Sequence, residues 1–316
     1  MEDNSTTTNR ENLGERNPLL TLAEHIRGKG AARVIDYHVH ERHSRDAAMA
    51  KISEYIAAAE GRGITEIAFT THLITIGPDV DLSIREEEIP EYIREIRMAQ
   101  DGTRIKLLAG LEVDYFPGEE RHLEAILRGN DFDFILGSTH YINGVDIGSQ
   151  SQAEGYFANR SITEAADEYY KVWKRAIESG LFDVMAHPDY WRKYLRFYGR
   201  SALWGDYGSV LFDSLDAMVD NGVGLEVNTA GKRAGTGNYY PIQEFLVAAH
   251  EAGVKVVTVG SDSHTAGTLG YHLEDAIRQL REASFTHMST FKDRKNTRIS
   301  IGDMLERTRT RAKLGI

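Results

Sequence analysis

From Arg33 onward, short apolar runs alternate with longer stretches in which apolar residues recur every three or four positions. The short runs fit buried parallel strands, and the longer stretches fit amphipathic helices that cover a sheet. Helices are predicted over residues 46–63, 161–180, 240–253 and 273–284, and several end at the glycine expected just past a helix. Seven strands are predicted, within "RVIDYHVH", "EIAFTTH", "KLLAGLEVD", "FDFILGSTH", "FDVMAHP", "VGLEVNT" and "VKVVTVGSDSH".

Seven near-regular βα repeats indicate an α/β fold. The chain lacks a glycine-rich dinucleotide-binding fingerprint, so a closed or nearly closed barrel is favoured over an open doubly wound sheet. No linker divides the chain, and residues 31–316 are expected to form a single domain. Residues 1–30 are polar at their start and lack the apolar core of a signal peptide, so they are expected to be a partly disordered extension.

Composition narrows the possible functions. The net charge of -11 argues against broad binding to nucleic acid or to a membrane surface. No apolar run approaches the length of a membrane-spanning helix, so a cytoplasmic location is the default expectation. The chain has no cysteine, which excludes disulfides, thiolate metal sites and thiol nucleophiles. Any metal must therefore be held by histidine, aspartate and glutamate.

Potential metal ligands lie at the carboxyl ends of the predicted strands. These ends converge on one mouth in a parallel barrel, where the chemistry of such folds takes place. Histidines two positions apart on a strand point to the same face, so both histidines of "HVH" can reach one site. The residues concerned are His38, His40, His72, Glu112, His140, His187, Asp262 and His264, with Asp46 just past the first strand.

Nine such residues exceed the four to six ligands that one transition metal takes. The other six of the twelve histidines fall in the N-terminal segment, in loops or on helices and are given no role. We therefore expect two or three divalent ions. Zinc, manganese and iron all accept ligands of this type.

The motifs "HVHERHSRD", "FTTH", "GLEVD", "GSTH", "AHPD" and "GSDSH", in this order, resemble those of the PHP (polymerase and histidinol phosphatase) superfamily of phosphoesterases. The resemblance covers roughly residues 33 to 302 and implies a distorted (β/α)7 TIM-like barrel with a trinuclear metal site at its C-terminal mouth. It also implies that the nine residues named above are the metal ligands. Thr71 stands where the family commonly has an acid before the histidine of its second motif, which leaves the support of His72 open.

Within this superfamily, the chain is more similar to the stand-alone histidinol-phosphatase branch. The stretches "GSTHYINGVDI", "LEVNTAGKR" and "TFKDRKNTRISI" carry this similarity, and the last is predicted to form a short hairpin after the barrel. The resemblance implies hydrolysis of a small phosphate monoester, L-histidinol phosphate, in histidine biosynthesis.

Phosphate ester hydrolysis needs a strong nucleophile, neutralisation of the phosphoryl charge and help for the leaving oxygen. The candidate phosphate-binding cations are Arg233, after strand six, and Arg192 or Lys193, after strand five. Asp262 is a candidate proton shuttle to the leaving group as well as a ligand. Asp114 and Glu119 are candidates for an acidic rim that binds the substrate amine.

Three other functions remain open from the sequence. One is a different PHP-type phosphoesterase or nuclease that acts on nucleotides or oligonucleotides, and another is an amidohydrolase-type metal hydrolase. The third is a metal-binding or regulatory module without turnover, which a complete ligand set disfavours. The oligomeric state is not determined by the sequence.

Overall fold

The computed structural model of the chain describes residues 34–195 and 202–306. The extension expected over residues 1–30 lies outside the described residues. One sheet of seven parallel strands forms the centre, as the sequence predicts, with the order β1-β2-β3-β4-β7-β8-β9. The strands are β1 Val34–Val39, β2 Ile64–Leu73, β3 Lys106–Asp114, β4 Phe134–Ser138, β7 Val184–Met185, β8 Gly224–Asn228 and β9 Val257–Gly260.

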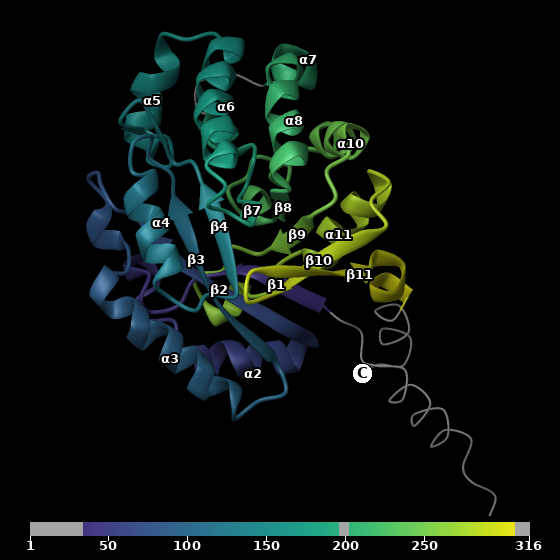
Figure 1. Cartoon of the computed structure of the whole chain (residues 1–316). Helices are drawn as coiled ribbons and strands as arrows, with labels where there is room; N and C mark the ends of the chain where they lie inside the picture. The colour runs from purple at the N-terminus through teal and green to yellow at the C-terminus, as the bar shows by residue number, and fades with distance from the viewer. Residues whose placement is uncertain (1–33, 196–201, 307–316) are drawn as a thin grey trace, which may run out of the picture.

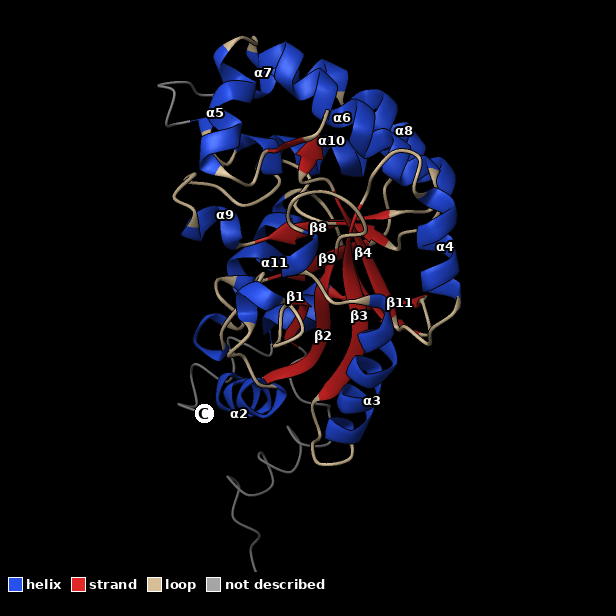
Figure 2. Ribbon diagram, turned by 90° about the vertical axis from the view of Figure 1, so that its left-hand side faces the viewer, coloured by secondary structure: helices blue, strands red, loops and turns tan. Residues whose placement is uncertain are grey.

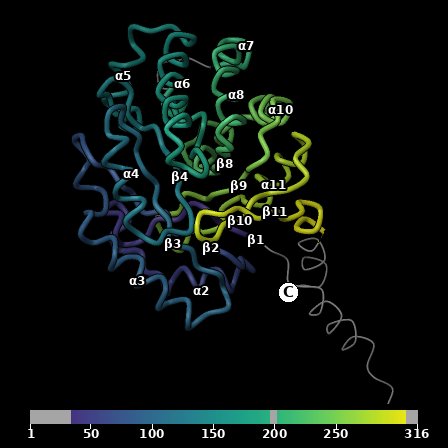
Figure 3. The backbone as a smooth tube through the Cα atoms, in the orientation of Figure 1, coloured from purple at the N-terminus to yellow at the C-terminus, as the bar shows by residue number. Residues whose placement is uncertain are grey.

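The first and last strands of this sheet approach each other and nearly close the barrel. Val39 pairs with Ser263 in a parallel bridge, and the backbone N–H of His40 donates to the carbonyl of Ser263 at 2.8 Å. The Tyr55 hydroxyl lies over this seam and donates to the carbonyls of His40 and Ser263. In Figure 3 the seam lies between the purple β1 and the yellow-green β9. The predicted (β/α)7 barrel is thus confirmed.

Helices surround the strands (Figure 2). Figure 1 shows α2 and α3 on one side of the sheet and α6, α8 and α10 on the other. No helix in the two described ranges combines the length and the apolar character needed to cross a bilayer. The helices are α2 Ile52–Arg62, α3 Ile89–Gln100, α4 Glu120–Arg128, α5 Gln150–Ala158, α6 Ile162–Glu178, α7 Trp204–Tyr207, α8 Phe212–Asn221, α9 Ala230–Arg233, α10 Gln243–Ala252 and α11 Leu273–Glu282.

The longest helix, α6, shows how local sequence sets its ends and its buried face. Ser161 caps it, because its hydroxyl accepts from the Glu164 N–H while the Glu164 carboxylate accepts from the Ser161 N–H at 2.8 Å. Tyr169 and Trp173, four positions apart, are fully buried on one side. The helix predicted over 46–63 starts later, at Ile52, because residues Arg45–Ala47 form a separate 3-10 turn, η1.

The amino ends of the strands are covered by the antiparallel hairpin of β10 (His287–Lys292) and β11 (Lys295–Ser300), which confirms the predicted hairpin. The Phe291 N–H donates to the Tyr37 hydroxyl at 2.8 Å, and Lys106 Nζ donates to the Phe291 carbonyl at 2.8 Å. The Phe291 ring packs on Phe134 at 4.8 Å between centroids. Lys106 and Phe134 begin β3 and β4, so the hairpin lies at the end opposite the predicted metal residues.

At the other end, a small hairpin of β5 (Tyr141–Ile142) and β6 (Val145–Asp146) follows β4. A loop with the 3-10 turns η2 (Val80–Leu82) and η3 (Glu86–Glu88) follows β2, and η4 (Tyr190–Arg192) follows β7. These segments border the mouth of the barrel and supply part of the lining of the cavity described next.

Candidate metal centre

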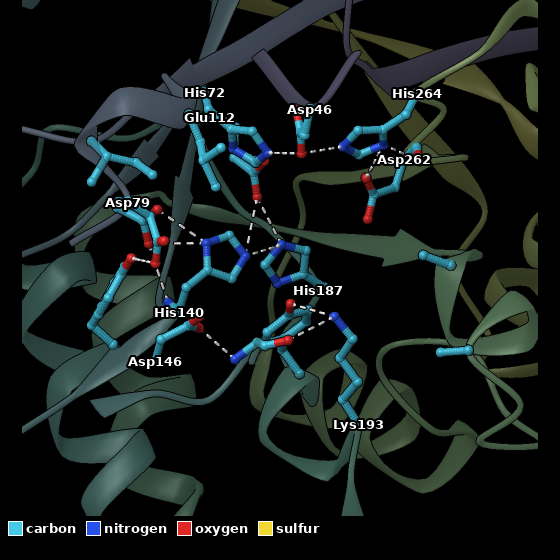
Figure 4. A pocket seen from close by; sticks show the side chains of 18 of the residues that line it. Asp46, His72, Asp79, Glu112, His140, Asp146, His187, Lys193, Asp262 and His264 are labelled. Carbon is cyan, nitrogen blue, oxygen red and sulfur yellow. Dashed lines mark hydrogen bonds and ion pairs between the residues drawn. The ribbon is translucent and has the colours of Figure 1, made fainter. Parts of the chain in front are cut away.

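The structure brings all nine predicted metal residues together at the carboxyl ends of the strands (Figure 4). They surround the floor of a cavity of about 290 Å³. His38 and His40 are fully buried beneath this floor, while seven residues reach the lining: Asp46, His72, Glu112, His140, His187, Asp262 and His264.

Glu112, which is 1% exposed, lies at the centre of the group. Its Oε2 is 3.1 Å from His38 Nε2 and 3.0 Å from His72 Nδ1. Burial raises the pKa of a carboxyl, but the charges of His38 and His72 outweigh burial here and hold the Glu112 pKa well below its usual value. Five imidazoles surround this one carboxylate: His38, His40, His72, His140 and His187.

Two further carboxylates connect the histidines on the open side. Asp262 Oδ1 lies 3.4 Å from His40 Nε2 and 3.5 Å from His264 Nδ1. Asp46 Oδ2 lies 3.0 Å from His264 Nε2 and 3.5 Å from His72 Nε2. The η1 turn therefore brings Asp46 back over the strand ends, as its place in the sequence suggested.

Two of these residues adopt backbone conformations that side chains other than glycine seldom take. His187 has φ 26° and Asp262 has φ 53°. Positive φ of this kind costs free energy and is concentrated at functional sites. Arg233 stabilises the backbone at Asp262, because its guanidinium donates to the carbonyls of Ser261 and Asp262.

The nine residues fit a metal cluster because several of their buried ring nitrogens have no hydrogen-bond partner. His38 Nε2, His40 Nε2 and His72 Nδ1 are buried without a hydrogen-bond partner, although each faces a carboxylate oxygen. Burial and the neighbouring His264 and His72 lower the pKa of His40 to about 3, which keeps its imidazole neutral, the form that ligates. Cations between these nitrogens and oxygens would satisfy both. Potential ligand atoms lie within 4.8 Å of one another in three sets: His40, His72 and His264; His38, Glu112 and His187; His38, His40 and Asp262.

Supporting residues hold the histidines from behind. Asp114 is 1% exposed and accepts from both the backbone N–H and Nδ1 of His140. Asp114 also lines the cavity, where His140 engages its carboxylate, so its expected role toward the substrate amine stays a prediction. Glu119, the other expected rim residue, contacts His122 and is absent from the cavity lining.

Thr71, the departure from the family pattern, acts through a serine. Its hydroxyl lies 2.7 Å from the Ser44 hydroxyl, which contacts His40 Nδ1 at 3.1 Å and accepts from the His72 N–H at 3.0 Å. The missing acid is thus replaced by a hydroxyl chain that supports His40 and the backbone of His72. Sequence reasoning missed Ser44, and it also missed Glu226, which contacts His38.

The three predicted phosphate-binding cations differ in position. Lys193 lines the cavity, with Nζ 2.9 Å from the Tyr190 hydroxyl. Arg192 lies behind it, 3.4 Å from the buried Asp189 carboxylate, and is not part of the lining. Arg233 lies beside the mouth on the Asp262 backbone, over the Tyr271 ring. Of these three cations, Lys193 alone is part of the cavity lining.

Known proteins share both the sequence and the fold. The sequence profile of the PHP domain matches residues 36–230. A probable histidinol-phosphatase of Deinococcus radiodurans is 32% identical over 77% of this chain and 90% of its own length. The histidinol-phosphatase of Lactococcus lactis subsp. lactis is 25% identical over 83% of this chain and 95% of its own length.

Among solved structures, a histidinol phosphate phosphatase from Lactococcus lactis subsp. lactis, complexed with zinc, L-histidinol and phosphate, superposes with a TM-score of 0.73. It is 24% identical, and the match covers 85% of this chain and 100% of the other. Because the PHP profile matches more than half of its length, the chain belongs to the PHP domain family, and it is similar to histidinol-phosphatases along most of its sequence.

Proposed function

We propose that this protein is a metal-dependent phosphatase that hydrolyses L-histidinol phosphate to L-histidinol and phosphate. The observation that carries the proposal is the buried Glu112 among five imidazoles, which is a ready site for cations at the mouth of a PHP barrel. The assignment of this substrate is supported by relatives that are named histidinol-phosphatase and that align with most of the chain.

The proposed cofactors are two or three divalent ions of zinc, manganese or iron. Ions at this position would supply a hydroxide nucleophile near neutral pH and would neutralise charge on phosphoryl oxygens. The zinc in the related Lactococcus structure supports the choice of a transition metal. The proposed ligands are His38, His40, Asp46, His72, Glu112, His140, His187, Asp262 and His264.

The chain's own cations bind and orient the phosphoryl group. Lys193 Nζ is held by the Tyr190 hydroxyl and the Gly148 carbonyl, which leaves donor capacity for a phosphoryl oxygen on the cavity side. Arg233, beside the mouth, is the second proposed phosphate-binding residue. Asp262 is 17% exposed on its side chain and is the carboxylate proposed to take the proton that the attacking water loses and pass it to the leaving alkoxide oxygen.

The organic part of the substrate carries an ammonium and an imidazole, so it requires acids on the outer wall. Asp79 and Asp146 line the cavity on this wall and face it in Figure 4. Asp79 accepts from the Tyr141 hydroxyl, which ties the loop after β2 to the hairpin after β4. We propose these two aspartates for the acidic rim in addition to Asp114, whereas Glu119 is not part of the cavity lining.

The deciding experiment compares kcat/KM for L-histidinol phosphate, p-nitrophenyl phosphate, a nucleoside monophosphate and an amide substrate on the zinc- or manganese-loaded protein. Histidinol phosphate should exceed the generic ester by at least an order of magnitude, because contacts to the substrate body help to position the phosphoryl group. A nucleotide or amide as the best substrate would contradict the assignment. A cytoplasmic location, and a small-molecule partner rather than nucleic acid, are part of the same proposal.

A further inference from the structure

Glu226, in the middle of β8, is a fully buried carboxylate outside the proposed ligand set. Its Oε1 lies 2.9 Å from His38 Nδ1. Its Oε2 accepts from the backbone N–H of His187 at 2.9 Å and from Asn228 Nδ2 at 3.1 Å. One carboxylate thus connects two proposed ligands that come from β1 and from the segment after β7.

The hydrogen bonds around Glu226 determine which nitrogen of His38 is free. A carboxylate only accepts, so the contact with Glu226 places the His38 proton on Nδ1. The Asn228 Oδ1 accepts from the Ala230 N–H at 2.8 Å, so its Nδ2 is turned to this pair, 3.1 Å from Glu226 Oε2 and 3.3 Å from His38 Nδ1. Glu226 Oε1 is the nearer partner of His38 Nδ1 at 2.9 Å and can only accept, so it accepts the hydrogen bond from Nδ1. In the neutral imidazole, the form that binds metal, His38 Nε2 then carries the lone pair, and it lies 3.1 Å from Glu112.

The neighbouring strand is shaped to admit this pair. A Cβ on Gly260 of β9 would lie 2.1 Å from Glu226 Oε1 and 2.4 Å from the Cβ of His38. Distances this short are not tolerated, so only glycine lets β9 pass over the Glu226–His38 contact. The contact between Glu226 and His38 is therefore enclosed by β1, β8 and β9.

We propose that Glu226 is a positioning residue, which holds His38 in the tautomer and orientation that bind metal and fixes the backbone of His187 beside it. A carboxylate behind a ligating histidine raises the basicity of the imidazole and sets its ring plane, and loss of such a partner typically weakens metal binding by about 10–100-fold. The inference rests on the proposed metal site and adds a residue to it.

Glu226→Gln is a sharp test, because glutamine has nearly the same shape but carries one donor. The His187 N–H and the Asn228 amide require an acceptor at the Oε2 position. The glutamine NH₂ is therefore directed to the Oε1 position, where it donates to His38 Nδ1. That moves the His38 proton to Nε2 and removes the lone pair that faces the site.

The experiment measures zinc binding to the metal-free full chain. Competition with a chromophoric chelator gives the affinity, and elemental analysis gives the number of ions per chain. Glu226→Gln should lower the zinc affinity of one site by about 10–100-fold and leave the affinity of the other sites near its original value. It should also alter the visible absorption of the cobalt-loaded protein. Glu66→Gln is the matched control, a buried carboxylate with Lys106 and Tyr37 as partners at the opposite end of the barrel. It should leave metal binding unchanged.

Unchanged zinc affinity in a folded Glu226→Gln protein would overturn the inference. A lower melting temperature together with unchanged affinity would mean that Glu226 stabilises the fold without acting on the metal site. Should Glu226→Gln not fold, Gly260→Ala tests the same contact by separating Glu226 from His38, and it should produce the same selective loss. If the unaltered chain binds no metal, the proposed function fails and the inference fails with it; if only the variant comparison shows no difference, the inference alone fails.

Discussion

His140 Nε2 and His187 Nε2 contact each other at 3.2 Å in the wall of the cavity, with Glu112 Oε1 2.8 Å from the latter. Without metal, this contact requires a proton on one of the two nitrogens. Asp114 favours the charged form of His140 and raises its pKa, although burial alone would lower it. A cation that contacts both nitrogens and the carboxylate would replace that proton.

The first prediction concerns metal content. The purified and reconstituted protein should contain more than one transition-metal ion per chain, because seven of the nine potential ligands form three sets of closely spaced ligand atoms. Elemental analysis against protein concentration gives this number. Treatment with a chelator should abolish turnover, and readdition of zinc or manganese should restore it. A content of one ion or fewer after reconstitution would refute the cluster.

The second prediction concerns the central carboxylate. Glu112→Ala should lower kcat by roughly a thousandfold or more, equal to about 4 kcal/mol, because it removes the group shared by the histidines. The fold should persist, since functional residues are often suboptimal for stability. Circular dichroism and thermal melting of the metal-free proteins check this, and His38→Ala should behave in the same way. Global unfolding of both variants would instead assign the group a structural role.

The third prediction concerns Arg233. Arg233→Ala should lower kcat/KM by roughly a hundredfold, equal to about 3 kcal/mol, if its guanidinium binds the phosphoryl group in the transition state. The arginine also holds the backbone at Asp262, so metal content must be measured in parallel. Loss of activity with full metal content identifies phosphate binding, whereas loss of an ion identifies support of Asp262. Unchanged kinetics would remove Arg233 from the site.

The fourth prediction separates the adjacent cations Arg192 and Lys193. Lys193→Ala should raise KM at least tenfold with little change in thermal stability, because Lys193 lines the cavity. Arg192→Ala should instead destabilise the fold by about 3 kcal/mol, because it leaves the buried Asp189 carboxylate without its ion pair. Urea unfolding and steady-state kinetics on both variants decide this, and the reverse pattern would contradict the placement.

The fifth prediction concerns substrate selectivity. Asp79→Asn and Asp146→Asn should each reduce the preference for histidinol phosphate over p-nitrophenyl phosphate by roughly tenfold, because the amide cannot balance the charge of the substrate ammonium. The rate with p-nitrophenyl phosphate is the internal control and should change little. Equal losses on both substrates would place these aspartates in the phosphoryl chemistry instead.

The sequence predicted the parts of the fold that depend on local pattern. Strand β3 was predicted with its observed bounds, whereas "FDVMAHP" contributes only the two-residue strand Val184–Met185. The nine metal residues could be predicted because strand alternation and parallel topology fix where strand ends meet. Contacts between distant residues could not be predicted in this way.

Glu226 illustrates that limit. It is separated from His38 by 188 positions, and no spacing rule relates them. A charged residue within the apolar run "VGLEV" was a signal that it has a buried partner, but not of which partner. Asp114 gave a similar signal, because it follows Glu112 by two positions and so points to the same face of β3. The loop residue Asp79 is placed by tertiary contacts that local pattern does not encode.

The seam between His40 and Ser263 has a consequence for how the protein is made. The two segments that meet there are more than 200 residues apart, so on the ribosome His38 and His40 emerge long before Asp262 and His264. Non-local pairing of this kind is slow to form, because the intervening chain must first be ordered. The metal centre can therefore be completed only after residues 257–264 have been made and β9 has docked beside β1. Until then the early histidines are available to bind metal outside the native arrangement.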